Sequence, residues 1–125
     1  MRFHHSHIKI KDLDQTRAFF CDALDFSELR CDRIEEHGLS ILYLTAPGDQ
    51  GADAPCLELA CYDGDDSISD GNRFAHIGLA VDSVDKECER LSALGVTILL
   101  PPQNGQYAYI QSPDGLVIEL IADPA

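Results

Sequence analysis

CLELA at residues 56–60 and VIELI at residues 117–121 share one pattern, an apolar strand with a single glutamate in its middle. Each segment lies downstream of a strand that carries a histidine, His5 in the first case and His76 in the second. A glutamate inside a strand is costly unless it is paired, protonated or bound to a cation. Two histidines and two glutamates offer two nitrogen and two oxygen ligands, which suit one divalent metal ion.

The elements around these segments recur in the same order. Apolar spacing predicts a strand, a helix and three strands in the first half of the chain, at residues 4–10, 13–24, 27–35, 39–45 and 56–60. The second half repeats the order at residues 74–81, 84–94, 96–100, 106–111 and 117–121. Turns are expected at residues 101–105 and 112–115, and helix caps at Asp12 or Asp14 and at Ser83 or Asp82.

A tandem βαβββ repeat of this kind predicts two similar pieces related by pseudo-twofold symmetry. The fold class is therefore α+β. We interpret residues 1–125 as a single domain, with module one at 1–61, a linker at 62–73 and module two at 74–125.

The charge of the chain restricts the classes of partner. The formal net charge is −13, which argues against nucleic acid and against an anionic membrane surface, since both attract basic patches. An anionic substrate would need local cations, and residues 91–125 contain no lysine or arginine. No apolar run has the length of a membrane span, and the N-terminus lacks the apolar core of a signal peptide, so we expect a cytoplasmic protein.

Five cysteines form no Cys-x-x-Cys pair, and an odd number without a secretory signal indicates reduced thiols. Cys21, Cys56 and Cys88 fall at positions that the periodicity assigns to the core, where cysteine acts as a small hydrophobe.

Four motifs carry a resemblance to a known family: MRFHH at residues 1–5, LEL at 57–59, AHIGLAVD at 75–82 and SPDGLVIEL at 112–120. With them the chain resembles the vicinal-oxygen-chelate superfamily, and within it the short bacterial glyoxalase I (lactoylglutathione lyase) group. The resemblance implies that the two modules form an incomplete barrel of the glyoxalase/bleomycin-resistance/dioxygenase type. It also implies a homodimer with active sites at the subunit interface.

The metal ligands implied by the resemblance are His5, Glu58, His76 and Glu119. His7 lies on the same face of its strand as His5 and stays an alternative to it. His76 has the alternative of a hydrogen-bonded core histidine, and each glutamate has the alternative of facing water. By resemblance, Glu119 is the main catalytic base, and Glu58 is able to act on the opposite face of the substrate.

The implied reaction converts the hemithioacetal of methylglyoxal, a 2-oxoaldehyde, and a thiol to a lactoyl thioester through an enediolate. One divalent ion per site would act as a Lewis acid toward the developing charge, while a carboxylate moves the proton. The resemblance favours nickel or cobalt, with zinc as the alternative. Methylglyoxal detoxification would be the role of such an enzyme.

Two positions depart from the glutathione-binding pattern of the family. Lys9 stands where relatives carry arginine, so we expect it to bind substrate without the bidentate fork, and Tyr62 stands where asparagine is usual. Two other classes therefore stay open. One is another metal-dependent enzyme of the superfamily, such as an epimerase, an extradiol dioxygenase or a thiol transferase. The other is a non-enzymatic drug-binding resistance module.

Overall fold

The computed structural model describes residues 1–65 and 67–123. These residues form two compact units, Met1–Ser69 and Asp70–Ala125, and the linker expected at residues 62–73 spans the boundary between them. Residue 66 of that linker and residues 124 and 125 of module two lie outside the described residues. Within the described part of the chain, no helix is long and apolar enough to cross a membrane.

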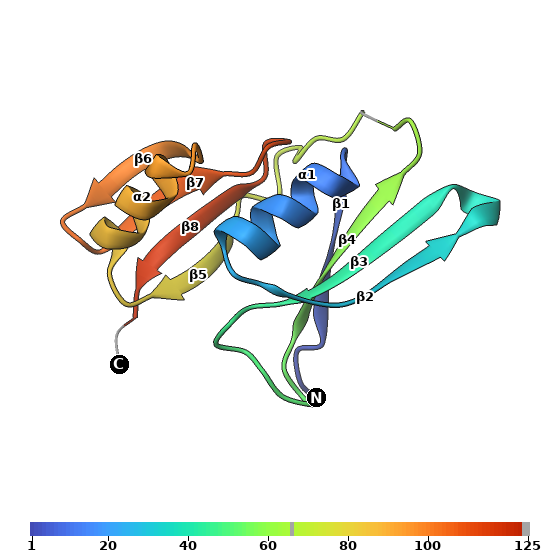
Figure 1. Cartoon of the computed structure of the whole chain (residues 1–125), viewed down its shortest axis with the longest axis horizontal. Coiled ribbons are helices and arrows are strands. Elements are labelled where there is room, and N and C mark those ends of the chain that lie inside the picture. The colour runs from blue at the N-terminus through green and yellow to red at the C-terminus, as the bar shows by residue number, and fades with distance from the viewer. Residues whose placement is uncertain (66, 124–125) are drawn as a thin grey trace. The chain divides into compact units, whose positions relative to one another are not determined.

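The first unit is a four-stranded mixed sheet with one helix of several turns, α1 continued by η1, and a short 3-10 helix, η2 (Figure 1). Its elements are β1 His5–Ile10, α1 Leu13–Arg17, η1 Ala18–Ala23, β2 Ser27–Ile34, η2 Glu35–His37, β3 Leu39–Thr45 and β4 Cys56–Tyr62. The strand order is β1-β4-β3-β2, with β1 parallel to β4 and the other pairs antiparallel. The first and last strands of the unit therefore lie side by side, which brings residues some 50 positions apart into register.

The helix expected over residues 13–24 changes type along its length. Asp12, and not Asp14, caps it by accepting a hydrogen bond from the Gln15 amide at 2.9 Å. After α1 the chain continues as the π-helix η1, in which the Leu24 amide donates to the Phe19 carbonyl. Phe19 and Phe20, which are adjacent in this wider turn, are both buried. In a regular α-helix, consecutive side chains point about 100° apart around the helix axis.

The second unit repeats the order of the first, with β5 Ile77–Val81, α2 Val84–Ala93, β6 Thr97–Gln103, β7 Tyr107–Gln111 and β8 Val117–Ala122. Its strand order β5-β8-β7-β6 is that of the first unit, and β5 is again parallel to β8. Ser83 caps α2 by accepting a hydrogen bond from the Lys86 amide at 3.2 Å. Two open mixed sheets with few helices confirm the α+β class.

Two predicted boundaries in the second unit are wrong. The turn expected over residues 101–105 is strand at Pro101 and Pro102, which the sheet tolerates because β6 is an edge strand and needs fewer amide donors. The turn itself is the pair Asn104-Gly105, both with positive φ, as a tight hairpin requires. The strand expected from residue 74 begins at Ile77, whose register partner in β8 is Ile118.

Each sheet buries one face under the helix of its own unit. In the first unit α1 contacts β3, and in the second α2 contacts β6, β7 and β8. The buried strand residues on these helix-covered faces include Leu42, Leu44, Leu57 and Leu59 in the first unit and Ala108, Ile110, Ile118 and Leu120 in the second. Because side chains alternate along a strand, Glu58 and Glu119 each lie on the other face of their own sheet, opposite to the helix-covered face. This face of each sheet is called its open face.

Candidate metal centre

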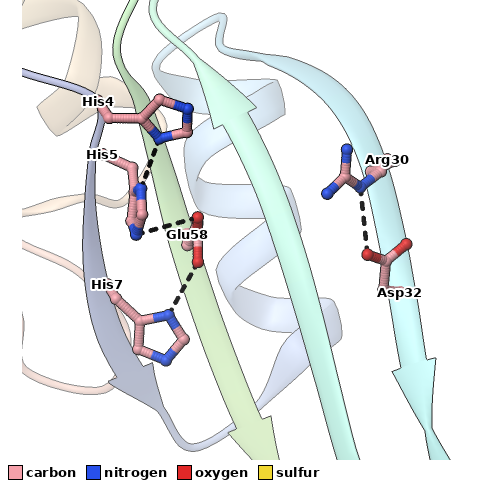
Figure 2. A network of polar contacts seen from close by, with 6 residues as sticks. All are labelled: His4, His5, His7, Arg30, Asp32 and Glu58. Atoms are coloured by element: carbon pink, nitrogen blue, oxygen red, sulfur yellow. Dashed lines mark hydrogen bonds and ion pairs between the residues drawn. The ribbon is translucent and has the colours of Figure 1, made fainter.

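The register of β1 against β4 places two histidines beside Glu58. His7 is the direct partner of Glu58, and His5 precedes it by two residues on the same face. His5 Nε2 lies 3.3 Å from Glu58 Oε2, and His7 Nδ1 lies 3.0 Å from Glu58 Oε1. Figure 2 shows the two imidazoles pointing at the same carboxylate, one toward each oxygen. The Glu58 side chain is only 13% exposed, so this contact replaces part of its hydration.

A further histidine orients His5 from its other side. His4 Nδ1 and His5 Nδ1 are 2.7 Å apart, so one ring donates its N–H and the other accepts (Figure 2). This leaves His5 Nε2 directed at Glu58. Metal-binding histidines usually donate their second ring nitrogen to a fixed partner, and His4 is positioned to be that partner.

The row across the open face of the first sheet continues beyond Glu58. Tyr43 on β3 is the register partner of Glu58, and Arg30 on β2 is the register partner of Tyr43. The Arg30 guanidinium lies 4.0 Å from the centre of the Tyr43 ring, and its Nε donates to Asp32 at 3.2 Å. Contacts with Tyr43 and then with Asp32 raise the pKa of Arg30, so this group stays charged.

Lys9 and Tyr62, the two departures from the family pattern, lie in contact with each other. The Lys9 ammonium is 5.3 Å from the centre of the Tyr62 ring, at a distance that allows a cation–π interaction. Lys9 follows His7 by two residues on β1 and therefore shares its face.

The second sheet builds a similar pair around Glu119. Ile118 and Leu120 are buried on the helix-covered face, so Glu119 projects from the open face. His76 lies just before β5, and its Nε2 is 3.8 Å from Glu119 Oε1. Tyr109 is the register partner of Glu119, and its ring centre lies 5.4 Å from that of His76.

The turn before β8 fixes this register. Ser112 Oγ accepts a hydrogen bond from the Leu116 amide at 2.9 Å and donates to Asp114 at 2.8 Å, while Gly115 adopts a φ of 99°. The Pro-Asp-Gly turn thereby determines where β8 begins and which residue of β7 faces Glu119.

The separation within each pair can be compared with that of two ligands on a divalent ion. At metal–ligand distances of about 2.1 Å, two neighbouring ligands of an octahedral or tetrahedral ion lie about 3.0–3.4 Å apart. The His5–Glu58 separation of 3.3 Å falls in this range, and the His76–Glu119 separation of 3.8 Å exceeds it by a few tenths of an ångström. Imidazole and carboxylate suit nickel, cobalt and zinc. The residues present therefore fit a divalent ion.

The structure brings His5 together with Glu58, and His76 together with Glu119, each pair within its own unit. Among residues 1–65 and 67–123, no three His, Cys, Asp or Glu side chains are arranged to hold a metal ion. Each pair is therefore half of the expected ligand set.

Sequence reasoning missed the aromatic and cationic members of the two rows, Tyr43, Tyr109 and Arg30, and it did not identify His4 as a partner of His5. The alternating pattern gives each residue's face but not which residue of the next strand lies opposite, so these neighbours required the strand register.

The cysteines are free thiols, as expected. Cys88 is buried, but Cys21 and Cys56 are only half-buried, which corrects their assignment to the core. Cys56 begins β4 and shares the open face with Glu58, which explains its partial exposure. Burial raises the pKa of all three thiols, so they are poor nucleophiles.

Comparison with known proteins identifies the family to which the chain is similar. Residues 2–120 match the sequence model of the Glyoxalase/Bleomycin resistance protein/Dioxygenase superfamily. The lactoylglutathione lyase of Salmonella typhimurium is 31% identical over 126 residues, spanning 97% of this chain and 92% of that protein. The Escherichia coli O157:H7 lactoylglutathione lyase is 30% identical, spanning 98% and 93%. Among solved structures, the trypanothione-dependent glyoxalase I of Leishmania major matches with a TM-score of 0.87 and 26% identity, over 98% of this chain and 86% of that one.

Proposed function

Because the chain belongs to the glyoxalase/bleomycin resistance protein/dioxygenase superfamily, we propose that it uses its two His–Glu pairs to catalyse a glyoxalase I reaction. Its similarity to lactoylglutathione lyases over nearly their whole length makes it an enzyme of the glyoxalase I type, acting on a small molecule. The observation that supports the proposed site most directly is the repeated pair, with an imidazole nitrogen 3.3 Å from one glutamate and 3.8 Å from the other.

The substrate is proposed to be the hemithioacetal of a 2-oxoaldehyde such as methylglyoxal, and the product a lactoyl thioester. His5, Glu58, His76 and Glu119 would hold one divalent ion, with nickel or cobalt favoured over zinc. When bound, this ion supplies Lewis-acid stabilisation of the charge that develops on the substrate oxygens.

The proton transfer itself falls to the carboxylates. Glu119 would remove the proton from the carbon that bears sulfur and return it to the neighbouring carbon, which completes the internal oxidation and reduction without an external electron donor. The 3.8 Å separation from His76 leaves this carboxylate without a hydrogen bond to that ring, so it has freedom to move between the two carbons. Glu58 would act on the opposite face of the substrate.

Lys9 is proposed to bind the anionic part of the thiol. It lies on the same face of β1 as His5 and His7, and its ammonium rests against the Tyr62 ring. A single ammonium attracts an anion but does not form the two parallel hydrogen bonds of an arginine. Selectivity between glutathione and other anionic thiols would therefore depend on the residues around Lys9. The five free thiols fit a reducing compartment, and we propose the cytoplasm.

The activity test is reconstitution of metal-free protein with nickel, cobalt and zinc in turn, followed by assay with methylglyoxal and glutathione. We expect thioester formation with at least one metal and none after chelation. His37→Ala is the matched control, because His37 is exposed on η2 and belongs to neither pair. Metal binding without thioester formation would favour another enzyme of the superfamily, and absence of metal binding would favour a drug-binding module.

A second test addresses whether two chains share each site in a homodimer. One variant lacks the first pair (His5→Ala with Glu58→Ala), and the other lacks the second (His76→Ala with Glu119→Ala). If each site takes one pair from each chain, dissociating and reassociating a mixture restores about a quarter of the wild-type activity, because half of the dimers are mixed and each has one intact site. Absence of activity in verified mixed dimers would contradict a shared site.

A further inference from the structure

The strand register aligns the two units residue by residue. Glu58 lies between its β1 partner His7 and its β3 partner Tyr43. Glu119 lies between its β5 partner Gly78 and its β7 partner Tyr109. The repeat therefore equates the two glutamates and the two tyrosines, and it equates His7 with Gly78. The first unit has an imidazole where the second has only a hydrogen atom.

This substitution changes how each carboxylate is held. Glu58 has His5 at 3.3 Å from one oxygen and His7 at 3.0 Å from the other (Figure 2). Glu119 has His76 at 3.8 Å, and a Cβ placed on Gly78 would lie 3.8 Å from the same Glu119 oxygen. The second unit thus has no side chain beside its carboxylate in the place where the first unit has a hydrogen-bonding ring, and a methyl group there would only touch the carboxylate.

We propose that His7 is a positioning residue that fixes Glu58 as a metal ligand, while Gly78 leaves Glu119 free to move a proton. This inference rests on the proposed function. For the substrate face that Glu119 serves, it assigns the two halves of the site different tasks: the first holds the ion, and the second combines metal binding with proton transfer.

The chemistry of the contact defines the direction of the hydrogen bond. A carboxylate only accepts, so His7 must carry its proton on Nδ1 and donate it to Glu58 Oε1. The bond removes the freedom of one carboxylate oxygen and leaves the other, Oε2, directed at His5. Groups that orient metal ligands in this way typically change metal affinity about 10- to 100-fold when removed.

The repeat also argues against His7 as the ligand in place of His5. His76 precedes Gly78 by two residues, as His5 precedes His7, so His5 is the counterpart of His76. In addition, His7 Nδ1 lies at hydrogen-bond distance from Glu58. Because this nitrogen carries the proton that it donates to Glu58, it is not available to bind a metal ion.

The test measures metal affinity by chelator competition in wild-type protein, His7→Ala, His7→Asn and the control His37→Ala. An asparagine amide nitrogen takes nearly the place of His Nδ1 and can donate the same bond. We expect His7→Ala to weaken metal binding about 10- to 100-fold, His7→Asn to recover most of the loss, and the control to match wild type. In metal-free protein, nitrogen NMR should show His7 with its proton on Nδ1.

Three outcomes would overturn the inference: unchanged affinity in His7→Ala, a loss in His7→Asn as large as in His7→Ala, or a His7 ring protonated on Nε2 alone. These results in a protein that binds metal and forms the thioester would leave the proposed function intact. Wild-type protein that binds no metal would remove both proposals together.

Discussion

Replacing Glu119 with glutamine keeps the size of the side chain and removes its ability to accept a proton. The fold should not change, because the buried neighbours Ile118 and Leu120 lie on the other face of β8. The carboxylate is 21% exposed, and His76 lies beyond hydrogen-bond distance at 3.8 Å, so little structure depends on its charge. We expect kcat to fall about 10²–10⁴-fold, the usual contribution of a general base, which corresponds to about 2.7–5.5 kcal/mol of barrier.

The same substitution at Glu58 should give a different result. Glu58 is 13% exposed and lies within 3.3 Å of both His5 and His7. The amide would replace a charged acceptor that is worth about 1.5–3 kcal/mol in such a bond, so metal affinity should fall about 10- to 100-fold. Saturating metal should then restore much of the turnover in Glu58→Gln, but not in Glu119→Gln.

The assay measures kcat and KM across metal concentrations for both variants, with metal affinity from chelator competition and urea unfolding as a check of stability. Wild-type kcat in Glu119→Gln would remove this residue from the role of base. Identical profiles for the two variants would refute the division of tasks between the two units, because an unequal environment is the reason for expecting unequal effects.

Three further predictions concern substrate binding and stability. Lys9→Met should raise the KM for glutathione about two- to fivefold, as expected for a partly exposed charge, and leave kcat unchanged in steady-state kinetics; a changed kcat would contradict a binding role. Leu59→Ala should lower the free energy of unfolding by about 2–5 kcal/mol in urea titrations, because Leu59 is fully buried, and a smaller loss would mean that the sheet relaxes around the cavity. The hydrogen bond from Arg33 lowers the pKa of Asp63, so Asp63→Asn should reduce stability at neutral pH; this difference should shrink as pH falls below the ordinary carboxyl pKa of about 4 and vanish below the lowered pKa of the folded state, and a difference that persists there would refute this.

The repeated order of elements could be predicted from the sequence because apolar spacing reports each strand and helix locally. The same pattern identified the two glutamates, since a carboxylate between buried leucines and isoleucines stands out in any strand. The repeated layout also singled out His5 and His76, the resemblance implied that they are metal ligands, and the structure places a histidine beside each glutamate. Their gathering around one ion stays a prediction.

The remaining features depend on register or on local backbone geometry, which periodicity does not report. A one-residue shift of β1 against β4 would separate His7 from Glu58 without changing any hydrophobic pattern in β4. Pro101 and Pro102 suggested a turn because proline disfavours central strands, and only the position of β6 at the edge of its sheet permits them. The π-helix after Arg17 has the same apolar spacing as an ordinary helix over most of its length.

The charge of the chain bears on how an anionic thiol would reach the site. With a net charge of −13, the overall field opposes such a substrate, so its binding depends on cations that nearby carboxylates do not neutralise. Arg33 forms ion pairs with Asp63 and Glu35, whereas Lys9 rests on the neutral Tyr62 ring, and its charge adds to the Ser67 hydrogen bonds that lower the pKa of Asp65. A cation held by an aromatic face keeps its charge available to a second partner, because the ring contributes only its quadrupole. The tyrosine at position 62 therefore gives Lys9 a partner without a charge, while Asp65 opposes part of its attraction for an anion. That attraction should weaken as salt shortens the screening length.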